Sequence, residues 1–269
     1  RNEENFIQIC LDSIIANDYP KSSFEALVID GKSEDRTREV VKKYTRRYSF
    51  IRLLDNPKKV TPCGLNRGIK EARGEYILWM SAHNEYSSNY IRKCVEYSIK
   101  FKADNVGGII KVVPRNSSFI GKLIALVLSH PFGVGNSAFR IGTRGPKWVD
   151  AVFGGCYKRE IFEKIGLFNE NLVRGQDMEF SLRMKRAGYK TLLVPDIVSY
   201  YYARSDLKSY LYHNFINGVW VIMPMKFVSY MPVAWRHLVP LVFVASLIGS
   251  GLLSLIFPIF LWLFVLIFI

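Results

Sequence analysis

The stretch "FEALVIDGKSEDRTREVVKKYTRRY" (24–48) joins two kinds of pattern. Residues 24–30 form a short apolar run that ends at Asp30, just before a glycine and a polar loop, which predicts a strand followed by a turn. A helix is predicted next, with Asp35 as a candidate N-cap. Its apolar face would carry the following residues: Val40, Val41, Tyr44 and Tyr48.

The same alternation continues to residue 114. Further strands are predicted at 50–56, 75–80 and 106–114, and further helices at 63–74 and 88–101. Strand and helix in this order predict an α/β fold with a mainly parallel central sheet covered on both faces. Ligands bind such sheets beyond the carboxyl ends of the strands. We therefore expect Asp30 and the polar segment 81–85 to lie at the same edge.

Composition separates two readings of the basic charge. The chain has 269 residues, 49% hydrophobic residues and a formal net charge of +14. Because no helix-turn-helix, zinc-finger or RNP-like motif is present, the sequence argues against a nucleic-acid binder. A domain held against anionic lipid explains the charge more simply. The four cysteines lack any C-x-x-C spacing, so we expect reduced, packed thiols: Cys10, Cys63, Cys94 and Cys156.

The C-terminal part has the composition of a membrane-associated region. Residues 238–269 contain no ionisable side chain, and about 20 apolar residues span a bilayer. Pro258 and the small residues at 249–251 favour two helices over one. Residues 119–133 are apolar but too short to span, so they either lie on the membrane or pack in the core. The chain starts without methionine and stops within apolar sequence, which predicts a fragment.

Several segments together resemble glycosyltransferase family 2, the inverting enzymes with a GT-A fold, from residue 1 to about 236. "LVIDGKSEDRT" (27–37) is similar to the family's nucleotide loop, and "TPCGLNRGIKEARGEYILWMSAH" (61–83) to its next helix and strand. "FGGCYKREIFEKIGLFNENLVRGQDMEF" (153–180) is similar to the acceptor-side block. The resemblance is strongest to the succinoglycan-type glucosyltransferases, whose metal loop reads Asp-Ala-His.

The resemblance implies three regions. Residues 1–206 would form the GT-A catalytic domain without its first strand. Residues 207–236, rich in aromatic residues and scattered lysines, would lie at the membrane interface. Residues 237–269 would form one or more transmembrane segments, which we expect to be truncated.

The resemblance also assigns a donor side. Asp30 would accept hydrogen bonds from a uracil ring or a ribose, and Glu3 would join it from the first loop. Asn66 and Arg67 would begin a helix at the same edge, where amides and a guanidinium can meet diphosphate charge. The alternative for Asp30 is an ordinary turn-forming aspartate.

The acceptor side would carry the catalytic base. In "GQDMEF" the resemblance assigns this role to Asp177, which would take the proton of the attacking hydroxyl. Gly155 and Gln176 would help to bind the acceptor. The structural alternative is that Asp177 only caps a helix, while Glu179 pairs with Arg183 four residues later.

The metal loop is altered. Ser81 stands where the family has its first metal-binding aspartate, whereas His83 is present. If the segment is extended, Ser81, His83 and Glu85 share one face, and Glu85 could supply the missing carboxylate; a solvated glutamate is the alternative. We expect a weakly bound divalent metal ion, Mn²⁺ or Mg²⁺, with the nucleotide diphosphate supplying most ligands.

These expectations combine into one function. The chain would be a membrane-attached inverting glycosyltransferase that moves a hexose from a nucleotide-diphosphate sugar, with a UDP-sugar as the expected donor. A lipid-linked saccharide would accept it in exopolysaccharide or cell-surface glycan synthesis, at the cytoplasmic face of the plasma membrane. "HNFINGVW" (213–220) keeps only the tryptophan of the processive Gln-x-x-Arg-Trp motif, which favours addition of a single sugar. The alternatives are a non-catalytic GT-A-like protein that binds nucleotide or lipid, and a basic membrane-surface adaptor.

Overall fold

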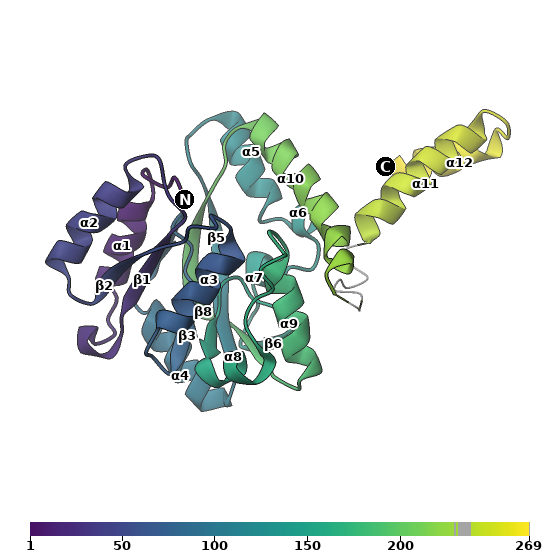
Figure 1. Ribbon diagram of the computed structural model, residues 1–269. Helices are drawn as coiled ribbons and strands as arrows, with labels where there is room; N and C mark the ends of the chain where they lie inside the picture. The colour runs from purple at the N-terminus through teal and green to yellow at the C-terminus, as the bar shows by residue number, and fades with distance from the viewer. Residues whose placement is uncertain (229, 231–237, 269) are drawn as a thin grey trace.

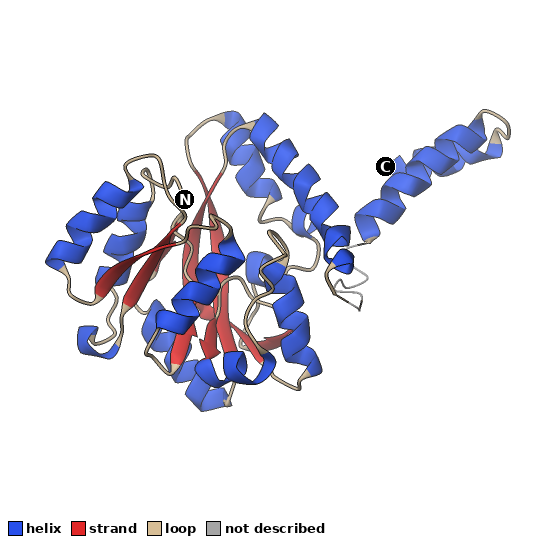
Figure 2. Cartoon of the chain, viewed as in Figure 1, coloured by secondary structure: helices blue, strands red, loops and turns tan. Residues whose placement is uncertain are grey.

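The computed structural model describes residues 1–228, 230 and 238–268. Helices lie on both sides of the strands over residues 1–206 (Figures 1 and 2). The strands are β1 Ala26–Asp30, β2 Ile51–Asp55, β3 Tyr76–Leu78, β4 Asn84–Tyr86, β5 Asn105–Pro114, β6 Lys147–Val149, β7 Cys156–Lys158 and β8 Thr191–Ala203. The helices of this part are α1 Ile7–Ile15, α2 Thr37–Arg47, α3 Thr61–Glu71, α4 Tyr90–Phe101, α5 Phe119–Val127, α6 Pro131–Val134, α7 Ala138–Ile141, α8 Arg159–Ile165 and α9 Gln176–Arg186.

Some of the expected C-terminal features cannot be placed. Positions 229 and 231–236 of the expected interfacial segment lie outside the described residues. The same holds for positions 237 and 269 of the expected transmembrane segment.

The segment that opens the fold forms the predicted strand and helix, but the N-cap of α2 is Arg36 and not Asp35, which accepts a hydrogen bond from the Thr37 amide. β1 and β2 pair in parallel, ending with Asp30 opposite Asp55. Val41 of α2 lies in the core that α1 and α2 form on one face of these strands. On the other face α3 comes close to β1, since a Cβ atom at Gly68 would lie 3.4 Å from Ile29. The predicted two-sided covering is confirmed here.

The six-stranded sheet is mixed, and the prediction of a mainly parallel sheet is wrong. Its order is β3-β7-β5-β8-β4, and β6 also pairs with β8. Among the pairings of described strands, β5 with β8 and β1 with β2 are parallel, and the other pairings are antiparallel. The prediction rested on residues 24–114, but β7 enters later in the chain, between β3 and β5 and antiparallel to both.

A bulge allows β5 and β8 to remain paired along their length. The register shifts between Gly108 and Ile109, so the β8 residues around Pro195 have no partner on β5. Proline lacks the N–H group that a strand ladder requires and is tolerated at bulges. The strands approach so closely here that a Cβ atom at Gly108 would lie 2.0 Å from the Ile197 carbonyl oxygen. This position therefore requires glycine.

Two cores lie on opposite faces of the six-stranded sheet. Cys156 of β7 belongs to the core formed with α1 and α4, and its neighbour Tyr157 belongs to the core formed with α3, α8 and α9. In the second core the rings of Phe168 and Phe180 lie 4.5 Å apart. The four cysteines are free and buried, as predicted.

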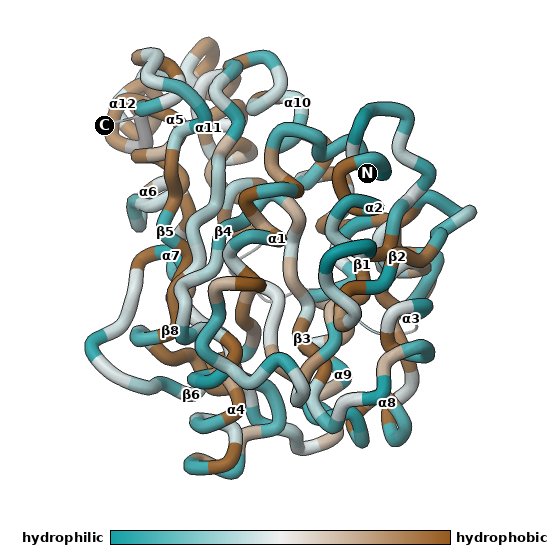
Figure 3. Tube along the Cα trace, turned by 90° about the vertical axis from the view of Figure 1, so that its left-hand side faces the viewer, coloured by the Kyte–Doolittle hydropathy of each residue, from teal (hydrophilic) through white to brown (hydrophobic). Residues whose placement is uncertain are grey.

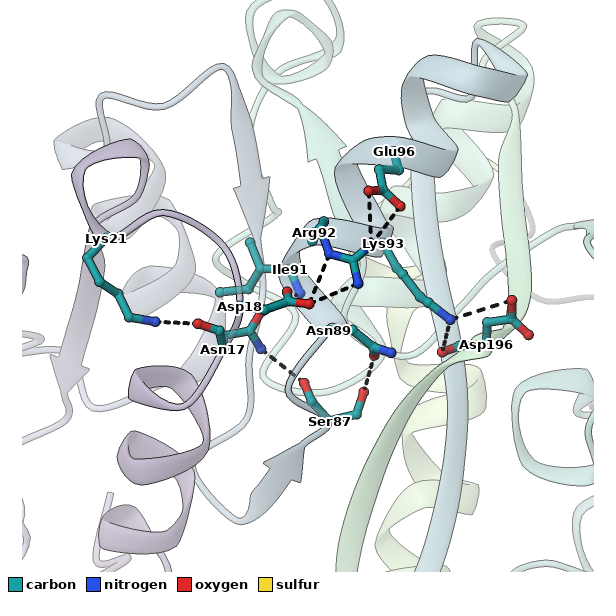
Figure 4. A network of polar contacts seen from close by, with 10 residues as sticks. All are labelled: Asn17, Asp18, Lys21, Ser87, Asn89, Ile91, Arg92, Lys93, Glu96 and Asp196. Atoms are coloured by element: carbon teal, nitrogen blue, oxygen red, sulfur yellow. Dashed lines mark hydrogen bonds and ion pairs between the residues drawn. The ribbon is translucent and has the colours of Figure 1, made fainter.

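A polar network fixes the start of α4 (Figure 4). The buried Asn17 side chain donates to the Ser87 carbonyl at 3.0 Å and accepts from the Ile91 amide at 3.2 Å. Arg92 pairs with Asp18 at 2.8 Å. These contacts tie the loop after α1 to the segment that follows β4, and so they hold β4 in place behind the polar loop at 81–85.

The C-terminal helices expose apolar residues. α10 covers Leu207–Ile222, the short 3-10 helix η2 covers Met223–Lys226, and α11 Val239–Ser254 is followed by α12 Ile259–Phe268. The break near Pro258 confirms two helices over one, and they are strongly apolar (Figure 3). No helix among the described residues combines the length and the apolar character needed to cross a membrane. α5 is mixed: Ile124 is buried, while Phe119 is exposed.

Candidate active site

Asp30 ends β1 and is buried among polar partners. Only 3% of Asp30 is exposed, and its carboxylate accepts from Ser33 Oγ at 2.5 Å, Ser33 N at 3.1 Å and Arg38 at 2.7 Å. Burial raises its pKa, but the hydrogen bonds from Ser33 and Arg38 outweigh this and hold the pKa below its usual value. Since a carboxylate offers about four acceptor positions, one position remains on the oxygen that faces Ser33 Oγ.

The side chains of Glu3 and His83 contact each other. The Glu3 amide donates to Thr37 Oγ1 at 2.8 Å, which fixes the first loop against α2. Its carboxylate lies 3.3 Å from His83 Nδ1. The His83 ring lies 5.4 Å from the ring of Tyr201 on β8. The structure thus brings together Glu3, which was predicted to contact the nucleotide, and His83, which was predicted to contact the metal ion, and the two contact each other.

The loop from Ser81 to Glu85 is not extended throughout. Residues 82–83 form a turn before β4, and the Ser81 amide donates to Tyr86 Oη at 2.6 Å. Glu85 accepts a hydrogen bond of 2.7 Å from Tyr202. The expectation that Glu85 shares a face with Ser81 and His83 is therefore wrong, because it assumed a continuous strand.

The donor set fits a metal ion only in part. The described residues include no group of three or more histidine, cysteine, aspartate or glutamate side chains that could hold an ion. His83 and Glu3 nevertheless offer one imidazole nitrogen and one carboxylate oxygen at 3.3 Å, a pair of donors that suits Mn²⁺. Such a pair would need further ligands from a substrate.

The structure corrects the assignment of Asn66. This residue lies within α3 and not at its start. Its buried amide donates to the Phe168 carbonyl at 2.8 Å and to Glu170 at 3.2 Å, and accepts from the Phe168 amide at 2.9 Å. Asn66 thus holds the loop after α8 and is not available to a nucleotide. Arg67, the next residue, is half-buried and stays a candidate for diphosphate contact.

Asp177 lies in the first turn of α9, half-buried. Burial raises its pKa, although backbone N–H groups at the helix start lower it in part. Gly175, with a φ of 74°, brings the preceding loop close to the end of α10. A Cβ atom at Gly175 would lie 3.6 Å from the Trp220 carbonyl oxygen and 3.8 Å from Pro224. A carboxylate of raised basicity therefore lies where the catalytic domain meets α10.

One part of the structural alternative for α9 is present, the pairing of Glu179 with Arg183, but the N-cap residue is Gly175 and not Asp177. Arg183 pairs with Glu179 at 2.6 Å and donates to the Ile165 and Leu167 carbonyls. Tyr230 donates to the same glutamate at 2.6 Å. Glu179 is therefore a structural residue, and Asp177 is the acidic side chain of this turn that lies outside that network.

The two predicted acceptor residues have distinct environments. Gly155 adopts a φ of 111°, and a Cβ atom there would lie 2.4 Å from Asn105 Oδ1. Its carbonyl accepts from the Trp79 amide at 3.0 Å, directly after β3. Gln176 is buried, and its Oε1 has no hydrogen-bond partner in the described part of the chain. That orphaned acceptor atom would suit a hydroxyl of a bound molecule.

A series of contacts links the two sides. Burial raises the pKa of Tyr157, and the charge of Asp177 raises it further. Tyr157 donates to the Gly154 carbonyl at 2.8 Å, and the adjoining Gly155 carbonyl accepts from Trp79, two residues before Ser81. These hydrogen bonds connect the segment of Gly154 and Gly155 with the residue that follows β3.

Sequence reasoning missed a group of side chains from α10. Arg174 donates to Asn217 at 2.7 Å and lies 3.4 Å from His213 Nδ1. Burial lowers the pKa of His213, and the charges of Arg174 and Arg204 lower it further. A signal was available in "HNFINGVW", whose polar residues interrupt an otherwise apolar helix.

Comparison with known proteins identifies the family. The model described as Glycosyl transferase family 2 matches residues 1–166. A dolichyl N-acetyl-alpha-D-glucosaminyl phosphate 3-beta-D-2,3-diacetamido-2,3-dideoxy-beta-D-glucuronosyltransferase of Methanococcus voltae is 30% identical over 264 residues, which is 95% of this chain and 81% of that protein. Succinoglycan biosynthesis protein ExoA of Rhizobium meliloti is 24% identical over 277 residues, covering 93% and 82%.

Solved structures agree on the fold. The crystal structure of GalNAc-T7 with UDP, GalNAc and Mn²⁺ matches with a TM-score of 0.58 at 18% identity. The match covers 74% of this chain and 41% of that one. The predicted family and its GT-A fold are confirmed. The chain belongs to glycosyltransferase family 2 and is a glycosyltransferase.

Proposed function

We propose that this chain is a membrane-attached inverting glycosyltransferase. It transfers a hexose from a UDP-sugar to a lipid-linked saccharide, in the synthesis of an exopolysaccharide or cell-surface glycan. The observation that carries the proposal is the half-buried Asp177, whose pKa is raised, at the junction of the catalytic domain and α10. The Methanococcus voltae relative, whose name describes a dolichyl-phosphate-linked acceptor, supports this acceptor class.

The transfer step assigns Asp177 as general base. Its carboxylate takes the proton of an acceptor hydroxyl while that oxygen attacks the anomeric carbon. The bond from that carbon to the donor phosphate breaks on the opposite face, and the nucleoside diphosphate leaves with the electron pair. A carboxylate with a raised pKa is a stronger base than an exposed one.

The donor binds beside Asp30, Glu3 and His83. The remaining acceptor position of Asp30 takes an N–H or O–H group of the nucleoside, and Arg67 approaches the diphosphate. Glu3 and His83 would hold a divalent ion, which would supply positive charge to stabilise the leaving diphosphate. The GalNAc-T7 structure, which contains UDP and Mn²⁺, supports this class of donor and metal.

Attachment to the membrane is supported by an apolar stripe on α10. Its exposed residues recur at three- and four-residue spacing: Leu207, Leu211, Phe215, Val219 and Ile222. α5 packs beside α10 and exposes Phe119 and Leu126. Apolar helices next to a basic domain favour the surface of an anionic membrane. We place the catalytic domain at the cytoplasmic face of the plasma membrane.

Turnover in a membrane tests the proposal. The full chain in vesicles would be given UDP-sugars and GDP-sugars with a lipid acceptor extract, in Mn²⁺, Mg²⁺ or EDTA. We expect transfer from a UDP-sugar that EDTA abolishes, with inverted anomeric configuration in the product. Retained configuration would exclude the single-displacement step, and transfer from GDP-sugars alone would exclude the donor.

The altered metal loop gives a separate prediction. Ser81→Asp restores a carboxylate near His83, so we expect Mn²⁺ affinity measured in the presence of UDP to rise about tenfold. Ser22→Asp adds the same charge at an exposed position outside the site and serves as the control. Equal Mn²⁺ affinity in wild type and Ser81→Asp would show that the ion does not bind beside this loop.

A further inference from the structure

A basic cavity lies between α5, α7, β8 and α10. It measures about 90 Å³, and its lining residues are Ile124, Leu128, Arg140, Tyr201, Arg204, Tyr210, His213, Asn214 and Asn217. No carboxylate is among them. The nearby Asp206 caps α10, where its oxygens accept from the amides of Lys208 and Ser209.

The cations of this cavity have no counter-ion in the described part of the chain. Arg140 has a long hydrogen bond of 3.4 Å to the Leu128 carbonyl, and its guanidinium lies 5.8 Å from the centre of the Tyr201 ring. Burial lowers the pKa of Arg140, and no carboxylate opposes that effect. Arg204 forms no ion pair with any described residue, and Arg174 contacts only Asn217 and His213.

Such an arrangement is costly unless an anion completes it. Arg140 is partly withdrawn from water, and an arginine in such a place is ordinarily paired with a carboxylate, whereas Arg204 lies exposed at the edge of the cavity. Here guanidinium, amide and phenol groups converge on one cavity, which is the donor set that a phosphate group requires. The cavity therefore has the chemistry of a phosphate site.

Its position distinguishes two sources of phosphate. On one side Tyr201 contacts His83, at 5.4 Å between rings, so the donor diphosphate is near. On the other side Ile124 and Leu128 belong to α5 and its C-cap, beside the exposed apolar residues of α5 and α10 (Figure 1). A lipid phosphate carries its charged group next to a hydrocarbon chain. This surface likewise places the arginines of the cavity next to apolar side chains of α5 and α10.

We propose that the cavity between α5, α7 and α10 binds the phosphate of the lipid-linked acceptor. The inference rests on the proposed function and assigns the acceptor's lipid phosphate to a site of its own. Arg140 and Arg204 contact the phosphate, and the lipid chain lies along the apolar side chains of α5 and α10. The acceptor sugar then extends from the cavity toward Asp177.

Binding without turnover tests this site independently of catalysis. The full chain would be titrated with phosphatidylcholine vesicles that carry a polyprenyl phosphate, and with vesicles that carry phosphatidylglycerol at equal surface charge. We expect tighter binding to the polyprenyl phosphate vesicles, and Arg140→Gln and Arg204→Gln should each weaken it about tenfold. Arg46→Gln, exposed on α2, is the matched control for lost charge.

UDP binding to the same variants distinguishes a site for the lipid phosphate from a site for the donor diphosphate. We expect UDP affinity to stay unchanged. Loss of UDP affinity with intact vesicle binding would assign the cavity to the donor diphosphate and overturn the proposal. Equal binding of wild type and variants to both vesicle types would also overturn it. Arg204 is exposed, so Arg204→Gln keeps the test valid if Arg140→Gln does not fold. Wild-type binding without sugar transfer would reject the function and leave the site intact.

Discussion

Replacing Asp177 with asparagine should lower the transfer rate about 10²–10⁴-fold, the range that a positioned general base contributes. The amide keeps the size of the side chain and can still accept a hydrogen bond, but it cannot take a proton. The rate would be measured with saturating donor, so that weaker binding does not imitate a chemical defect. Asp12→Asn, at an exposed position of α1, is the matched control and should leave the rate unchanged.

The raised pKa of Asp177 adds two expectations. Transfer needs the ionised carboxylate. The midpoint of the acid limb of the pH–rate profile should therefore lie above 3.8, the ordinary pKa of an aspartate. A carboxylate whose pKa is raised by folding destabilises the folded state at neutral pH, so Asp177→Asn should unfold at the same or a higher temperature. A variant that keeps more than a third of the rate would place the base elsewhere. A large fall in thermal stability would mean that the carboxylate is structural.

Local pattern predicted the site unevenly, and the reasons are physical. Asp30 was predictable because a strand of five residues positions its last side chain at the sheet edge. Glu85 was not, because a turn at residues 82–83 reverses the alternation on which the assignment depended. Asn66 has the composition of a ligand, but its partners lie more than 100 positions away at Phe168 and Glu170, and no local pattern indicates them.

The sheet shows the same limit on a larger scale. The alternation over residues 24–114 predicted the elements of that region except β4, which lies within the segment predicted as a polar loop. It could not predict strand order, because β7 is inserted by contacts with β3 and β5 that are distant in sequence. The basic cavity is a similar case. Its arginines come from α7 and the end of β8, and only tertiary packing brings them together.

Arg38→Gln should lower the free energy of unfolding by about 2–4 kcal/mol, because it leaves a buried carboxylate without its cation. Arg38 bridges Asp30 at 2.7 Å and Asp55 at 2.6 Å, and the Asp30 side chain is only 2% exposed. Stability would be measured by urea unfolding at pH 7. The control is Arg92→Gln, which also bridges two carboxylates, Asp18 and Glu96, but on the surface. Exposed pairs contribute about 0–1 kcal/mol.

The pH dependence identifies the group responsible. In the wild type the pKa of Asp30 is lowered below 3.8, so its contribution to stability is present above that value and is lost as the pH falls through the folded-state pKa. Without Arg38, only the hydrogen bonds from Ser33 still oppose the burial that disfavours the Asp30 anion, so the pKa of Asp30 is higher than in the wild type. The stability difference between wild type and Arg38→Gln should therefore be largest near neutral pH and shrink below about pH 4. A stability difference that stayed constant with pH would mean that Arg38 stabilises the fold through packing and not through its ion pair with Asp30. Asp30 could then bind a nucleoside without Arg38.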